Sequence, residues 1–138
     1  MKVLFMLVFS CFLSSAFAQL EKTLHQTFEV KDVKNIRVNL PSEYEVLAWP
    51  GDVILVETNV KLEQANAAIM NYVFENGRYQ ILFEGQKEGN FQMSYKNPNP
   101  QRLKTKFGLC DELVNIRIFV PESFDVSDKT LLRRNKDE

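Results

Sequence analysis

The sequence has 138 residues, with 17 basic and 18 acidic side chains and a formal net charge of −1. A charge this balanced lacks the surplus of lysine and arginine with which nucleic-acid-binding domains neutralise phosphates, so we exclude nucleic acid as a partner. Hydrophobic residues make up 45% of the chain and aromatic residues 12%, which is the composition of a packed domain and not of a disordered segment.

Residues 1–18 have the pattern of a secretory signal peptide. Lys2 gives a positive start, residues 3–13 are largely apolar, and the segment ends in Ala-Phe-Ala, a pattern that signal peptidase cuts. The apolar stretch is too short to span a membrane, and no later stretch has the length. We therefore expect cleavage after Ala18 and an exported protein without a transmembrane segment.

Removal of this leader leaves 120 residues, with 16 basic and 18 acidic side chains. This length suits a single domain, residues 19–138. Cys110 is then the only cysteine, so no internal disulfide can form. We expect Cys110 to be a small buried apolar group, with an intermolecular disulfide as the alternative. Lipidation at Cys11 is the alternative to simple cleavage, but Phe9 and the very short apolar run before Cys11 fit a lipoprotein signal poorly.

The first part of the expected domain is polar. Residues 19–26 are predicted to be a frayed lead-in, and residues 27–30 a short strand in which Phe28 and Val30 alternate with polar residues. A turn over residues 32–34 then leads into the most informative segment of the chain.

That segment, residues 35–46, recurs as residues 115–126. Five positions are identical, namely Asn, Ile, Arg, Pro and the final Val, and four more keep their chemistry. In each copy apolar and other side chains alternate up to Pro41 or Pro121, which predicts a half-buried strand that the proline ends. The unit is therefore strand, corner, strand, and the corner either closes a hairpin or turns a solenoid coil.

If the two copies play the same structural role, their apolar side chains face one core. These side chains are Ile36, Val38 and Leu40 in the first copy and Ile116, Ile118 and Val120 in the second. Arg37 and Arg117 should then lie on the opposite, wetter face, because successive side chains of a strand point to opposite sides.

Between the two copies the sequence predicts a turn, a long strand, a helix and a hairpin. Residues 49–52, Trp-Pro-Gly-Asp, match a type II turn with Gly51 at a positive φ. Residues 53–62 form the longest predicted strand. A helix follows at about residues 63–75, ended by Gly77. Its predicted buried stripe comprises Ala65, Ala68, Ile69, Tyr72 and Val73. Residues 78–95 then alternate about a turn at 85–90, which predicts a hairpin.

The Asn-Pro-Asn-Pro run at residues 97–100 is the strongest loop signal in the chain. The cations around it, with aromatic residues just upstream, are typical of a site for a polyanion, an anionic glycan or a lipid head group; the alternative is a solvated loop. These cations are Lys96, Arg102, Lys104 and Lys106. After the second copy the chain becomes polar again, and residues 129–138 are predicted to be a mobile tail.

The Val-Pro-x-x-Phe-x-Val corner at residues 120–126, after an alternating strand in an exported chain, resembles the adhesin-like, autotransporter-head-type β-solenoid domains of bacterial envelopes. Residues 35–79 also resemble short exported proteins of Bacteroidetes-type bacteria. The resemblance implies stacked β coils, a periplasmic or cell-surface location in a bacterium, and no catalytic residues. The helix and the lack of a long run of Gly-turn coils depart from that family. The expected fold is therefore mainly β with one helix, solenoid- or roll-like, with a compact β-sandwich as the alternative.

Few residue sets in the sequence can carry chemistry. His25 is the only histidine, and it lies in the polar lead-in, so a nucleophile–histidine pair has little basis. His25 and Cys110 are too few for a zinc site, and no acidic loop is dense enough to indicate calcium. Glu43 and Glu45 lie on one face of a strand and form the one carboxylate pair that a hydrolase could use. No cofactor is expected.

Three functional hypotheses remain. The first is a non-enzymatic exported envelope domain with a structural or binding role. The second is an adhesin-like module that binds a glycan or another surface polymer through Trp49 and the Lys96–Lys106 loop, although Trp49 alternatively packs over the sheet edge. The third and least supported is a carboxylate-based hydrolase.

Overall fold

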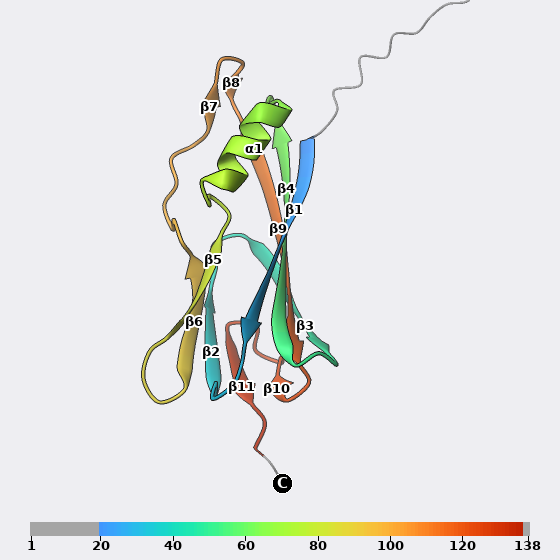
Figure 1. The fold of residues 1–138 in the computed structure, drawn as a ribbon, viewed down its shortest axis with the longest axis vertical. Coiled ribbons are helices and arrows are strands. Elements are labelled where there is room, and N and C mark those ends of the chain that lie inside the picture. Colours follow the sequence, from blue (N-terminus) through green and yellow to red (C-terminus); the bar gives the residue numbers. More distant parts are fainter. Residues whose placement is uncertain (1–19, 137–138) are drawn as a thin grey trace, which may run out of the picture.

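The computed structural model describes residues 20–136, so the expected signal peptide lies outside the described part of the chain. The fold is mainly β with one short helix (Figure 1). The elements in chain order are β1 (Leu20–Glu29), β2 (Asn35–Asn39), β3 (Glu43–Trp49), β4 (Val53–Glu63), α1 (Ala67–Glu75), β5 (Ile81–Gly85), β6 (Asn90–Tyr95), β7 (Lys104–Thr105), β8 (Gly108–Leu109), β9 (Asp111–Pro121), β10 (Phe124–Asp125) and β11 (Leu131–Arg134).

The strands form three open sheets. Sheet A has the order β1-β4-β9-β3, sheet B has the order β10-β11-β2-β6-β5, and β7 pairs with β8 alone. Sheets A and B are both mixed, because β3–β9 and β2–β6 are parallel pairs among antiparallel ones. The inward faces of the two sheets share one core, so the arrangement is sandwich-like. The expectation of solenoid coils is therefore corrected, since the chain passes back and forth between two sheets and its strands do not stack as successive coils.

The repeat explains how the chain crosses between the sheets. In the first copy the chain leaves β2 of sheet B at Pro41 and enters β3 of sheet A, and in the second it leaves β9 of sheet A at Pro121 and enters β10 of sheet B. The predicted apolar residues of both copies are buried in the shared core, and Arg37 and Arg117 face outward, which confirms that prediction.

A second, smaller core lies where α1 covers the inner face of sheet A beyond the end of sheet B (Figure 1). It combines β4 residues, α1 residues, Tyr79 and the buried Cys110. The helix begins at Ala67, not near residue 63, because the Asn66 side chain caps it by accepting a hydrogen bond from the Ile69 N–H at 3.0 Å. Gly77 follows the helix with φ +70°, as predicted.

The predicted stripe of the helix was partly wrong. Met70 and Val73 are the buried helix residues, Ile69 and Phe74 pack beside them, and Tyr72 is 65% exposed. Ala68 is exposed as well. The prediction placed Tyr72 in the core and left out Met70. The observed buried face is therefore rotated by about one residue around the helix axis from the predicted face.

Both predicted loose ends are parts of the sandwich. Residues 20–26 of the predicted lead-in belong to β1, which pairs with β4 from Leu20 to Glu29. The predicted tail contains β11, where Leu132 is fully buried and the Arg134 guanidinium donates to the Val33 and Val30 carbonyls, both at 2.7 Å. The strand β11 lies between β10 and β2, so Leu131–Arg134 of the predicted tail belong to sheet B.

No helix within residues 20–136 has the length and apolar character needed to cross a membrane.

Candidate functional site

The outer face of sheet A carries a polar hollow of about 480 Å³ to which all four strands contribute. We call it the trough. Strand pairing aligns its side chains in two rows across the sheet. One row is Thr23, Asn59, Asn115 and Glu43, and the next is Glu57, Arg117 and Glu45, which His25 continues on β1 outside the hollow. With neighbouring strands about 4.8 Å apart, each row extends roughly 14 Å.

The second row has an ion-paired centre. The Glu57 carboxylate accepts from Arg117 Nη2 at 2.7 Å on one side, and its other oxygen lies 3.5 Å from His25 Nε2. Glu57 is the least exposed of the three, at 21% of its side chain, whereas His25 and Arg117 are more than half exposed. This shared carboxylate fixes the direction of the Arg117 guanidinium over the trough.

The carboxylates of β3 are unpaired by comparison. Glu43 and Glu45 line the trough and are exposed, and neither forms an ion pair with any residue in the described range 20–136. In the first row the Asn59 amide is already used, because it donates to Glu21 and Thr23 at 2.9 and 3.0 Å. The trough therefore presents free acceptors on β3 next to an oriented cation, and its net charge is negative.

An apolar strip adjoins the trough at the end of the sheet where β3 finishes. In the next row Leu55, Phe119 and Leu47 lie side by side across three strands. Arg117 covers the Phe119 ring at 5.5 Å, and Leu47 is 36% exposed.

Trp49 packs against the sheet edge, the alternative that the sequence favoured over sugar stacking. Its indole N–H donates to the Val53 carbonyl at 2.9 Å, and its ring lies 6.0 Å from Phe119. The ring also covers Gly51, where an added Cβ would come within 2.4 Å of it. Gly51 is needed for this close approach and has no positive φ, so the predicted type II turn is wrong.

The five ligand-binding candidates do not form one site. Trp49 pairs with Pro121 at the last position of β9, whereas the cationic segment joins β9 at its first residue, Asp111. Ten strand steps of about 3.3 Å separate those two ends, a distance of roughly 33 Å. Arg102 is engaged with Asp111 at 3.2 Å. Lys96, Lys104 and Lys106 are exposed along the loop and the β7–β8 hairpin.

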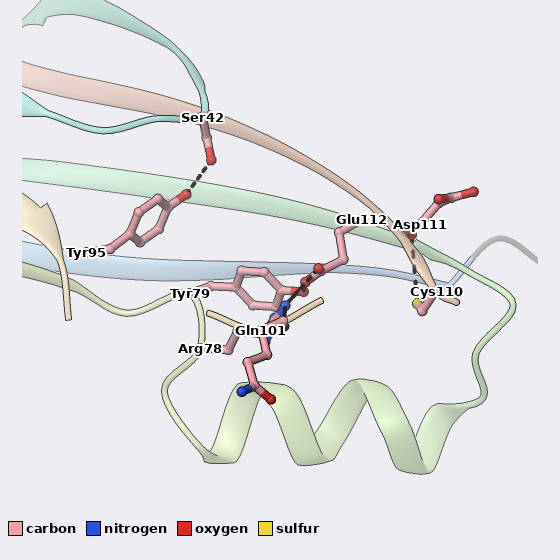
Figure 2. Close-up of polar contacts among 8 residues, drawn as sticks. All are labelled: Ser42, Arg78, Tyr79, Tyr95, Gln101, Cys110, Asp111 and Glu112. Atoms are coloured by element: carbon pink, nitrogen blue, oxygen red, sulfur yellow. Dashed lines mark hydrogen bonds and ion pairs between the residues drawn. The ribbon is translucent and has the colours of Figure 1, made fainter. Parts of the chain in front are cut away.

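A partly buried polar cluster anchors this loop to the sandwich, as Figure 2 shows. One Glu112 oxygen accepts from Arg78 Nε at 2.7 Å and from the Tyr79 hydroxyl at 2.6 Å, and the other accepts from Arg78 Nη2 at 2.8 Å. Arg78 also donates to the Gln101 carbonyl at 2.8 Å. Burial, and then the hydrogen bond to Glu112, raise the pKa of Tyr79, so its hydroxyl remains a donor. Both Glu112 oxygens accept hydrogen bonds from the protein, as is typical of a carboxylate with a structural role.

Near this cluster the Tyr95 and Ser42 hydroxyls form a hydrogen bond at 2.8 Å (Figure 2). This contact joins the end of β6 to the first corner of the repeat. Burial raises the pKa of Tyr95.

A second surface hollow, of about 540 Å³, lies over sheet B and includes Arg37 and Arg133. Its asparagines bond to each other, Asn35 Nδ2 donating to Asn90 Oδ1 at 2.9 Å. The outer faces of the two sheets thus differ in charge: the hollow on sheet A is acidic and the one on sheet B is basic. Within residues 20–136 no group of three or more His, Cys, Asp or Glu side chains is placed to hold a metal ion.

Comparisons with protein-family models, with curated proteins and with solved structures found no match. The interpretation of the trough therefore depends on its own geometry. Sequence reasoning singled out Glu43 and Glu45 there, but placed His25 in a frayed segment, and it missed Glu57, Asn115 and Arg117 as site residues. The available signal was the polar half of each strand's alternation, as in Glu57 and Asn59 between Val56, Thr58 and Val60.

Proposed function

We propose that this chain is an exported, non-enzymatic binding domain of the bacterial cell envelope, and that its trough binds a neutral or amino-bearing glycan. The observation that carries the proposal is that polar side chains from all four strands of sheet A, aligned in two rows, line one open hollow. The adhesin-like role expected from the sequence is retained as polymer binding, on a compact β-sandwich.

The chemistry of the trough favours a hydroxyl-rich ligand. Sugar hydroxyls can donate to the free carboxylates of Glu43 and Glu45 and accept from Arg117, so one ligand satisfies both kinds of group. The apolar strip beside the trough, with Leu47 and Phe119, suits the C–H face of a sugar ring. An anionic polymer is disfavoured, because it would approach two unpaired carboxylates.

Export is supported by the leader pattern in residues 1–18, which implies that the domain works outside the cytoplasm. A glycan ligand suits that location, since the envelope and its surroundings are rich in polysaccharide. The mature protein then needs no cofactor for its role.

The test is an array of bacterial surface glycans probed with the exported protein and two matched variants. Glu43→Gln/Glu45→Gln removes the free carboxylates, and we expect it to weaken binding on the order of tenfold or more, the loss of one or two charge-assisted hydrogen bonds. Arg37→Gln/Arg133→Gln alters two exposed arginines on the outer face of sheet B and should leave binding unchanged. The proposal is contradicted if Glu43→Gln/Glu45→Gln binds the glycans as well as wild type does, or if wild type binds only anionic glycans.

A carboxylate-based hydrolase is the second candidate, because Glu43, Glu45 and Glu57 line the same hollow. The same glycans provide the distinction. Release of reducing sugar that disappears in Glu45→Gln would indicate hydrolysis, whereas binding without product over a long incubation supports a binding domain.

A further inference from the structure

The β7–β8 hairpin holds two apolar side chains out in solvent. Phe107 is 56% exposed and Leu109 is 40% exposed. The hairpin that carries them lies at the end of the molecule where α1 is found (Figure 1). Large apolar side chains close together on a protruding tip mark an interaction surface.

The hairpin is firmly attached below its tip. The Cys110 N–H donates to the Leu103 carbonyl at 2.9 Å, and both side chains pack in the second core. The Thr105 hydroxyl donates to the Gln64 carbonyl at 3.2 Å, in the turn that precedes α1, and accepts from the Phe107 N–H at 3.1 Å. These contacts fix the base of the hairpin, so its tip is presented at a defined place.

The segment around the tip is positively charged. Residues 96–110 contain four cationic side chains and no acidic one. Lys104 and Lys106 are exposed, and the Lys106 ammonium lies 5.2 Å from the centre of the Phe107 ring. At the ends of β4 and β9, Glu63 pairs in register with Asp111, which Arg102 engages, and Glu112 is engaged by Arg78. The two lysines therefore remain available beside the apolar tip.

We propose that this hairpin docks the domain on an anionic lipid surface. Phe107 and Leu109 enter the boundary between head groups and acyl chains, and Lys104 and Lys106 contact the lipid phosphates. Apolar residues flanked by lysines are the combination that binds such interfaces, where burial and electrostatic attraction add together. The trough stays accessible, because Asn115, its lining residue on β9 nearest to the hairpin, is four residues along the strand from Asp111, about 13 Å away.

The test is sedimentation of the exported protein with vesicles. One set contains about one third phosphatidylglycerol in phosphatidylcholine, and the other contains phosphatidylcholine alone. We expect binding to the anionic set that weakens as salt is added. Lys104→Gln and Lys106→Gln should each reduce it about fivefold, the equivalent of about 1 kcal/mol per lysine. Phe107→Ser/Leu109→Ser should reduce it on the order of tenfold or more.

Two control variants distinguish binding through the hairpin tip from non-specific adsorption to vesicles. Tyr72→Ser removes an exposed aromatic residue on α1, and Arg133→Gln removes an exposed cation on β11, and both should bind vesicles as wild type does. Thermal melts of each variant check that it folds.

The proposal is overturned if wild type does not bind anionic vesicles, or if the serine double variant binds as well as wild type. It is also overturned if light scattering shows a dimer that the serine variant abolishes while vesicle binding persists, because the tip would then contact a second copy. If wild type binds anionic vesicles but no glycan, the proposed glycan binding by the trough is refuted and the docking proposal stands.

Discussion

Replacing Gln26 by leucine removes two hydrogen bonds that join sheet A to the free edge of sheet B. Gln26 lies on the inward face of β1, and its amide donates to the Ile81 carbonyl and accepts from the Ile81 N–H, both at 3.0 Å. Ile81 is the first residue of β5, the edge strand of sheet B. The side-chain amide thus takes the place of a neighbouring strand and occupies one donor and one acceptor of that edge.

The expected loss follows from what is left behind. Ile81 is 1% exposed, so water reaches its backbone groups poorly once the amide has gone. A buried polar group without a partner costs about 1–3 kcal/mol, and the leucine recovers part of this by burying apolar surface. We expect a net destabilisation of about 2 kcal/mol, which for a domain of this size lowers the melting temperature by roughly 6–10 °C.

The assay is thermal and urea unfolding of wild type and Gln26→Leu, with amide hydrogen exchange at Ile81. Exchange at Ile81 should accelerate in the variant, because its N–H loses its acceptor. Gln86→Leu is the matched control. It breaks an exposed hydrogen bond to Gln92 within one hairpin and should cost less than about 0.5 kcal/mol. If both variants melt within about 2 °C of wild type, the bridge between the sheets contributes no stability.

Three further predictions concern the core, the helix and a turn. Val38→Ala and Ile118→Ala should each lower the free energy of unfolding by roughly 1–4 kcal/mol in urea denaturation, because they truncate equivalent positions of the repeat in the shared core; a loss at one position alone would contradict that equivalence. Val73→Asp should cost about 3–5 kcal/mol in the same measurement by placing an unpaired charge in the second core, whereas Tyr72→Asp on the exposed side should stay within about 0.5 kcal/mol of wild type. Hydrogen bonds from the Thr130 side chain and backbone hold the pKa of Asp128 below its usual value, so the stabilisation by ionised Asp128 is present at neutral pH and is lost as the pH falls through the lowered pKa. The difference in free energy of unfolding between wild type and Asp128→Ala should therefore narrow below about pH 4, and a difference that stays constant with pH would contradict this linkage.

The alternation of apolar and polar side chains along single strands allowed these strands to be predicted from the sequence. The buried faces of β2 and β9 were predicted, because a period of two with Ile, Val and Leu on one side leaves only one way to bury them. The β5–β6 hairpin and the Gly77 cap were predicted for similarly local reasons, a turn between two alternating runs and a glycine able to take a positive φ.

Segments whose inward positions are not all apolar were misread. In β1 the inward face includes Gln26, whose partner Ile81 lies 55 positions away, so the strand looked like a polar lead-in. In β11 only Leu132 is fully buried, and Arg134 is held by carbonyls more than 100 positions away. Long-range hydrogen bonds of this kind leave no local pattern.

The site was predictable only in part, because it depends on the order of strands. Glu43 and Glu45 share a face by spacing alone, and that much was expected. Their meeting with Arg117 requires β3 to lie parallel beside β9, and the meeting of Glu57 with both Arg117 and His25 requires β4 between β9 and β1. Nothing local in the sequence specifies that order.

The most direct test of the account is an NMR titration of the isotope-labelled protein, residues 19–138, with a neutral oligosaccharide selected on the glycan array. The account predicts that the largest amide and side-chain shifts fall on the two rows of the trough, including Asn115 and Arg117. It also predicts that Glu43→Gln/Glu45→Gln needs on the order of tenfold more ligand to produce them. Shifts confined to the basic face of sheet B around Arg37, or no shifts in the presence of excess ligand, would contradict it.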